Sequence, residues 1–84
     1  MSFSVIWREA AEGRLADLWT TAADKDVVVR AADTIDDFLA RDAATVGESR
    51  GNSTRILIVD PLAVYYDVEE EERVATVWAV WRIR

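Results

Sequence analysis

The chain has 84 residues, 51% of them hydrophobic, with 16 acidic against 10 basic side chains and a formal net charge of −6 at neutral pH. It contains no cysteine and no histidine, which excludes disulfides, thiolate chemistry, the usual zinc sites and Ser–His triads within this chain. The acidic balance argues against broad, nonspecific binding of nucleic acids, which needs a basic surface. No secretion signal or membrane-length apolar run is visible, so we expect residues 1–84 to form one domain of a soluble cytoplasmic protein.

The N-terminal half predicts a strand followed by a helical hairpin. Residues 3–7 alternate around β-branched and aromatic side chains, as in a short strand. From Arg8 onward, apolar residues recur at three- and four-residue steps, first before and then after Asp24, which is typical of two amphipathic helices. Asp24 suits the N-cap of the second helix, and the short connection predicts an antiparallel hairpin. Trp7 and Trp19 lie on the apolar stripes, so we assign both to the core.

The C-terminal half predicts one long loop and then a three-stranded antiparallel meander. The loop covers residues 43–54 and includes Arg50; long loops in compact chains often carry function. Residues 55–59, 62–68 and 73–83 are rich in Val, Ile, Tyr and Trp, which favour strands. A proline turn and an acidic turn separate the three runs.

Pairing Val68 with Arg73 sets a register for the meander and divides its residues between two faces. One face is almost entirely apolar and is assigned to the helices: Leu57, Val59, Leu62, Val64, Tyr66, Val68, Ala75, Val77, Ala79 and Trp81. The other face carries Ile56, Ile58, Asp60, Ala63, Tyr65, Asp67, Val74, Thr76, Trp78, Val80 and Arg82.

This second face is too apolar for a surface that meets only water. We therefore predict a partner-binding surface made of Ile56, Ile58, Tyr65, Trp78 and Val80. A second copy of the chain and a different protein fit the pattern equally well as its cover. The alternative is that the chain's own first strand or long loop covers this face.

The order of strand, helical hairpin, long loop and meander ending in arginine resembles the RelE/ParE toxin superfamily. These are toxins of type II toxin–antitoxin systems, often described as plasmid stabilisation proteins. The segments that carry the resemblance are Ser4–Trp7, Ala31–Leu39, Arg55–Leu57, Val64–Val68 and Val77–Arg82. The resemblance implies an α+β fold of order β-α-α-β-β-β, with a helix hairpin packed on one face of a small antiparallel sheet. It also implies an antitoxin partner and one of two activities, cleavage of ribosome-bound mRNA or inhibition of DNA gyrase.

In RelE-like members, basic residues on the sheet stabilise charge while the RNA 2′-hydroxyl attacks the adjacent phosphate. The family's central arginine falls at Ala63, which cannot donate to a phosphate. Arg82 matches the terminal arginine of the last strand, and Arg50 is what remains of the basic residues before the meander. Tyr65 or Tyr66 approximates the family's tyrosine. The resemblance thus implies Arg82, Arg50 and Tyr65 as candidate catalytic residues in a depleted site, with no histidine to act as an acid.

Two functions follow from these observations. The chain is either a toxin-like component of a toxin–antitoxin module, or a non-catalytic module of the same fold that binds a partner or forms homo-oligomers. Whether it is an enzyme stays open. We expect no cofactor, metal or membrane partner. The one acidic run, Glu69–Glu72, is typical of a solvated hairpin tip, where metal binding would be weak and unspecific.

Overall fold

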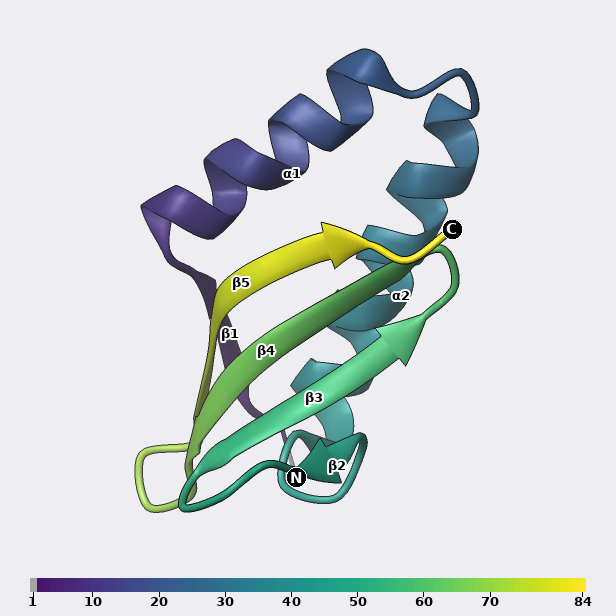
Figure 1. The fold of residues 1–84 in the computed structure, drawn as a ribbon. Helices are drawn as coiled ribbons and strands as arrows, with labels where there is room; N and C mark the ends of the chain where they lie inside the picture. Colours follow the sequence, from purple (N-terminus) through teal and green to yellow (C-terminus); the bar gives the residue numbers. More distant parts are fainter. Residues whose placement is uncertain (1) are drawn as a thin grey trace.

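Figure 1 shows the computed structural model of the chain, which describes residues 2–84. The elements follow one another as β1-α1-α2-β2-β3-β4-β5. Their bounds are β1 Ser4–Trp7, α1 Glu9–Thr21, α2 Lys25–Asp42, β2 Glu48–Ser49, β3 Thr54–Val59, β4 Leu62–Glu69 and β5 Val74–Arg82. The predicted α+β class and element order are confirmed, and the two-residue β2 within the predicted loop is an addition.

All five strands belong to one sheet, in the order β1-β5-β4-β3-β2. β3, β4 and β5 form the predicted antiparallel meander. The first strand, β1, pairs in parallel with β5 at the far end of the sequence, from Ser4 opposite Val74 to Trp7 opposite Val77. The sheet is therefore mixed, and not wholly antiparallel as expected. Parallel neighbours need a crossover connection, which is why the helices can lie between β1 and the meander along the chain.

Both helices cover one face of this sheet (Figure 1). α1 packs along β5, and α2 crosses behind β3 and β4. The apolar stripes of the helices and the inner side chains of the sheet bury one another in a single core: Phe3, Ala11, Leu18, Val28, Ala31, Ala32, Ile35, Leu39, Ala43, Leu57, Leu62, Val64, Tyr66, Ala75, Val77 and Val80. The opposite face of the sheet is uncovered, and Ile58 on it is 56% exposed.

The turn between β4 and β5 is longer than the sequence suggested. Val68 pairs with Ala75, two residues beyond the expected partner Arg73. Because side chains alternate with a period of two, this shift leaves the face of each residue near the turn unchanged. The assignment of Ala75 and Val77 to the helix side is therefore confirmed, and both side chains are fully buried.

A second register shift lies in the middle of this strand pair. Tyr66 pairs with Val77 but Tyr65 pairs with Ala79, so Trp78 is an extra residue on β5. This is the geometry of a β-bulge, which adds one residue to one strand and reverses the alternation beyond it.

The bulge corrects the predicted faces at the end of β5. Val80 pairs with Val64 and is 5% exposed within the core, so its placement on the open, partner-binding face was wrong. Arg82 pairs with Leu62 on the helix side, and Trp81 pairs with Ala63 on the open side. Ala79 likewise pairs with Tyr65 on the open side, although it was assigned to the helices. All four residues therefore lie on the face opposite to the one expected, because strict alternation allows for no bulge.

Two side chains of the sheet, Arg55 on β3 and Tyr66 on β4, hold the loop between α2 and β3 by hydrogen bonds to its backbone. Arg55 donates from Nε to the carbonyl oxygen of Val46 at 3.1 Å and from an Nη to that of Gly47 at 2.9 Å. The hydroxyl of Tyr66 lies 2.9 Å from the carbonyl oxygen of Ala43 and 2.6 Å from that of Val46. Burial raises the pKa of Tyr66, against the opposing effect of the nearby Arg55 guanidinium. The neutral hydroxyl therefore persists as a donor to the loop.

Candidate partner-binding site

Three aromatic rings form a row across the open face of the sheet. Tyr65 stacks on Trp78 with ring centroids 5.1 Å apart and planes inclined by 15°. On its other side Tyr65 meets Trp81 at 4.9 Å with the planes inclined by 48°. These spacings are those of favourable aromatic pairs. Together the three rings form an apolar surface, in which Trp78 is 36% exposed. We call Tyr65, Trp78 and Trp81 the aromatic row.

The β-bulge in β5 makes this row. Trp78 and Trp81 are three residues apart, and in a regular strand such residues point to opposite faces. The extra residue at the bulge removes that parity, so both indoles flank the same tyrosine. Bulges that re-aim side chains in this way are frequent beside functional sites.

Aliphatic residues extend the aromatic row toward β3. Ile56 pairs with Tyr65 and is half-buried, whereas Ile58 pairs with Ala63 and is largely exposed. Ala63 is fully buried without being part of the core beneath the helices, since its strand neighbours on the open face are Ile58 and Trp81. Of the predicted partner-binding residues, the structure brings together Ile56, Ile58, Tyr65 and Trp78, adds Trp81, and removes Val80.

Arg82 lies away from the aromatic row and binds the junction between the helices. Its two terminal nitrogens donate to both carboxylate oxygens of Asp24, at 3.0 and 2.7 Å. This two-point pair lowers the pKa of the Asp24 carboxyl and raises that of the Arg82 guanidinium. Asp24 stands at the predicted N-cap position of α2, but its side chain makes no capping hydrogen bond. The Asp24 carboxylate therefore binds an arginine of β5 and does not cap α2.

The other two predicted catalytic residues are also apart from Arg82. Arg50 is exposed beside β2, where it pairs with Glu48 at 3.3 Å and its backbone N–H bonds the carbonyl of Thr54. Arg82 lies near the other end of the six-residue β3, so the two arginines are separated by roughly 17 Å or more along the sheet. Tyr65 lies between them on the open face. The structure does not gather these three side chains into one site.

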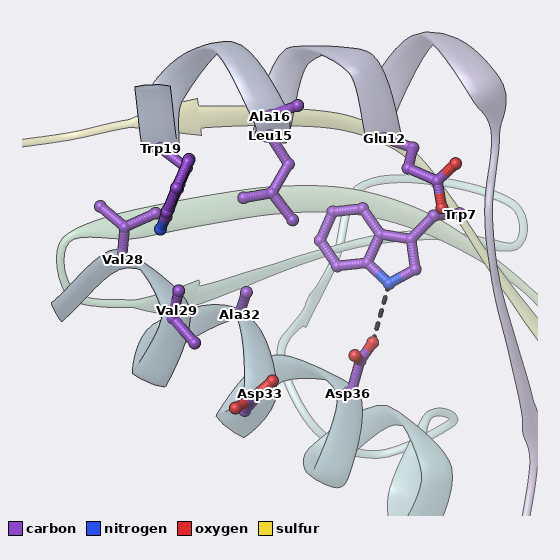
Figure 2. Close-up of a pocket in the computed structure, with 10 residues that line it drawn as sticks. All are labelled: Trp7, Glu12, Leu15, Ala16, Trp19, Val28, Val29, Ala32, Asp33 and Asp36. Atoms are coloured by element: carbon purple, nitrogen blue, oxygen red, sulfur yellow. Dashed lines mark hydrogen bonds between the residues drawn. The ribbon is translucent and has the colours of Figure 1, made fainter. Parts of the chain in front are cut away.

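A groove between α1 and α2 was not expected from the sequence (Figure 2). It has a volume of about 530 Å³ and is lined by Trp7, Glu12, Leu15, Ala16, Trp19, Val28, Val29, Ala32, Asp33 and Asp36. Trp7 stands at one end, where its indole Nε1 donates to Asp36 at 2.7 Å. Trp19 stands at the other end and is 43% exposed, so its assignment to the core was wrong.

One signal in the sequence points to this groove. Val29 follows the buried Val28 and is 45% exposed, so the apolar stripe of α2 is wider than the sheet needs. An apolar stripe that exceeds its own core indicates a second surface to be covered. The groove itself was not predictable, because the periodicity of two helices does not show how they cross.

Solved structures provide the comparison that decides the fold. The toxin–antitoxin complex RelBE2 from Mycobacterium tuberculosis superimposes with a TM-score of 0.80 at 14% identity, covering 98% of this chain and 92% of that chain. The chromosomal ParDE system from P. aeruginosa gives 0.72 at 13% identity, over 99% and 98% of the two chains. The isolated E. coli RelE toxin gives 0.70 at 15% identity, over 99% and 86%. The chain has the RelE/ParE toxin fold. No protein-family model and no curated protein sequence matches it.

The RelE/ParE fold confirms the resemblance that the sequence suggested. The aromatic row lies on the uncovered face of that fold, where Ala63 pairs with Trp81 and is fully buried. In residues 2–84 no group of three or more acidic side chains is arranged to hold a metal ion. Within residues 2–84, neither helix has the length and apolar composition that a membrane span requires.

Proposed function

We propose that this chain is a toxin-like component of a type II toxin–antitoxin module, which works in the cytoplasm and has a cognate antitoxin protein as its partner. The observation that carries the proposal is the aromatic row on the open face of a RelE/ParE-fold sheet. Tyrosine and tryptophan side chains dominate the energetics of protein interfaces, because they bury large areas at little conformational cost. A row that is already stacked loses little further freedom when a partner covers it.

We further propose that the catalytic site of the fold is depleted in this chain. Ala63 offers no charge to a phosphate, and both arginines that could compensate are engaged elsewhere, Arg82 with Asp24 and Arg50 with Glu48. A phosphate would have to displace the Asp24 carboxylate before Arg82 could bind it. Of the candidate catalytic residues Arg82, Arg50 and Tyr65, only Tyr65 lies on the aromatic row. The proposed action is therefore to hold a target macromolecule on the aromatic row, the same surface that the antitoxin covers, with any cleavage of RNA residual.

Controlled expression of the chain alone tests this proposal. We expect the wild-type chain to arrest growth, and Trp78→Glu, which places a charge in the aromatic row, to relieve the arrest. Asp37→Lys, on the exposed side of α2 and outside the aromatic row, is the control. We expect this variant to arrest growth as the wild type does. Arg50→Ala and Arg82→Ala test the candidate catalytic roles of the two arginines. If either substitution relieves the arrest, that arginine contributes to the activity and the site is not depleted. Normal growth at high soluble expression of the wild-type chain would contradict a toxin-like role.

Assays in vitro can distinguish between the two candidate targets of such a toxin-like protein. The resemblance offers ribosome-bound mRNA or DNA gyrase. Cell-free translation with mapping of mRNA ends reports the first, and a DNA supercoiling assay reports the second. A chain that only holds its target is expected to inhibit one of the two assays in proportion to its concentration, without producing cleaved mRNA.

A second candidate function is a non-catalytic module that forms homo-oligomers through the aromatic row. The engagement of Arg82 by Asp24 favours it, because that pair turns the terminal arginine into a structural link. Light scattering distinguishes the two functions: an assembly that Trp78→Glu disperses supports self-association. A wild-type chain that is monomeric at high concentration, or an oligomer that survives this substitution, eliminates it.

A further inference from the structure

The groove between α1 and α2 combines an apolar floor with an acidic rim. Leu15, Val28, Val29 and Ala32 supply aliphatic surface between the indoles of Trp7 and Trp19. Three of the ten lining residues are acidic, Glu12, Asp33 and Asp36, and no described residue among the ten is basic.

These carboxylates are available to an incoming group. Asp36 accepts one hydrogen bond from Trp7 and keeps its second oxygen. Within residues 2–84, the side chains of Glu12 and Asp33 take part in no ion pair or hydrogen bond. The basic side chains nearest the Trp19 end are already engaged, because Lys25 donates to the carbonyls of Thr20 and Ala22 and Arg30 pairs with Asp26.

We propose that this groove binds a basic, amphipathic helical segment of a partner protein. The apolar floor fits the apolar side of such a segment, and the three carboxylates fit lysine or arginine side chains along its flanks. The charge of the wider surface agrees, since residues 1–42 hold nine acidic and five basic side chains and so carry most of the net charge of −6. An acidic segment would meet repulsion along both walls.

The shape of the groove favours a helix over an extended chain. Its walls are helices, whose backbone N–H and C=O groups are already paired, so an extended segment would find no edge to complete its own hydrogen bonds. A helix pairs its backbone internally and needs only side-chain contacts. From Val29 to Asp36 the groove follows α2 for about 11 Å, or two turns of a bound helix. Apolar residues at i, i+3 or i+4 and i+7 would span it.

Two synthetic peptides of about 18 residues, long enough to form a helix, test this inference. Both carry leucines at i, i+3, i+4 and i+7; one has lysines on the remaining face and the other has glutamates. In calorimetric titrations of the full chain we expect the lysine peptide to bind roughly tenfold or more tightly than the glutamate peptide. NMR shift changes on adding the lysine peptide should centre on the groove residues. Equal affinities, no binding of the lysine peptide, or shift changes centred elsewhere would overturn the proposal.

Charge-reversal variants separate the groove from the general acidity of the chain. Glu12→Lys/Asp33→Lys reverses two carboxylates in the groove, and Asp17→Lys/Asp37→Lys makes the same change in charge at exposed positions of the same helices that do not line it. We expect the first pair to weaken the lysine peptide roughly tenfold more than the second pair. Equal losses would show that binding depends only on net charge and would refute a site in the groove.

The inference does not depend on the role of the aromatic row. Trp78→Glu lies on the other face of the sheet and is expected to leave peptide affinity unchanged, although it removes the function proposed above. A chain that binds the lysine peptide but fails to arrest growth would therefore refute the toxin-like role alone. If Trp78→Glu abolishes peptide binding, the peptide occupies the aromatic row and the groove proposal is wrong.

Discussion

Arg82 at the end of β5 donates hydrogen bonds to both carboxylate oxygens of Asp24, which lies at the junction of α1 and α2. The two residues are 58 positions apart in the sequence. The side chains are 30% and 40% exposed, so the pair lies at the boundary between solvent and core. It joins the last strand of the sheet to the tip of the helical hairpin. Two-point arginine–carboxylate pairs fix geometry as well as adding attraction, and this one holds the tip against the sheet.

The pH dependence of stability should report this pair. Arg82 lowers the pKa of Asp24, so the pair stabilises the folded chain above the ordinary carboxyl pKa of about 3.9 and loses its effect as the pH falls through the lower, folded value. We expect Asp24→Asn to unfold at lower urea concentrations than the wild type at pH 7. The two midpoints should converge as the pH falls below about 4. A difference that stays constant over this range would show that the ion pair contributes nothing.

Tyr65 and Tyr66 are neighbours with opposite roles, and removing each hydroxyl should separate them. Tyr66→Phe removes the hydroxyl donor that the loop carbonyls of Ala43 and Val46 share, and leaves Val46 only its bond from Arg55. We expect this change to cost about 1–2 kcal/mol in the free energy of unfolding. Amide hydrogen exchange in residues 43–54 should accelerate. Tyr65→Phe, on the open face, is the matched control with little effect on stability. Equal costs for the two changes would be inconsistent with the anchoring role.

Two glycines should respond to alanine with opposite signs. Gly47 has a φ of +75°, and a Cβ there would collide with the carbonyl oxygen of Ile56 and approach the Tyr66 hydroxyl at 3.2 Å. Gly47→Ala is therefore expected to lower the melting temperature. Gly13 lies within α1 with no atom near its missing Cβ, so Gly13→Ala should stabilise the chain by about 1 kcal/mol. Thermal unfolding of both variants tests the pair, and stabilisation by Gly47→Ala would contradict the loop geometry.

The reversal of faces beyond the bulge can be tested with one charge at two adjacent positions. Val80 is 5% exposed in the core, whereas Trp81 flanks Tyr65 on the open face. Val80→Asp buries an unpaired carboxylate and is expected to prevent folding at neutral pH. Trp81→Asp should leave a folded chain with weaker partner binding. Circular dichroism of the two purified variants shows which of them folds. A folded Val80→Asp beside an unfolded Trp81→Asp would support the regular strand without a bulge that the sequence predicted.

Most of the fold was predictable because it depends on periodicity. Alternation in residues 3–7 and in the meander, and the three- and four-residue steps of the helices, identified both helices and every strand except the two-residue β2. The bulge at Trp78 was not predictable, because it depends on packing between β4 and β5 and leaves no mark on the pattern of apolar residues. The parallel docking of β1 on β5 is likewise a long-range pairing with no local signal.

The candidate site was predictable in composition more than in position. The open face contains four residues as expected: Ile56, Ile58, Tyr65 and Trp78. The first three lie on β3 and β4, which carry no extra residue, and Trp78 is the bulged residue of β5 itself. Val80 and Arg82 follow the bulge and face the other way. Asp24 looked like a helix cap because aspartate before a helix commonly caps it, and its partner Arg82 lies too far along the chain to be inferred. The groove between the helices depends on how they cross, which periodicity does not specify.

The most direct test of a partner-binding aromatic row is the affinity of the chain for the cognate antitoxin proposed above. Isothermal titration of the wild type, of Trp78→Glu and of the control Asp37→Lys measures it. The account predicts that Trp78→Glu weakens binding roughly tenfold or more, equivalent to at least about 1.4 kcal/mol, with an unchanged melting temperature. The control should bind as the wild type does. Equal affinities for Trp78→Glu and the wild type would contradict the assignment of the aromatic row as the partner-binding surface.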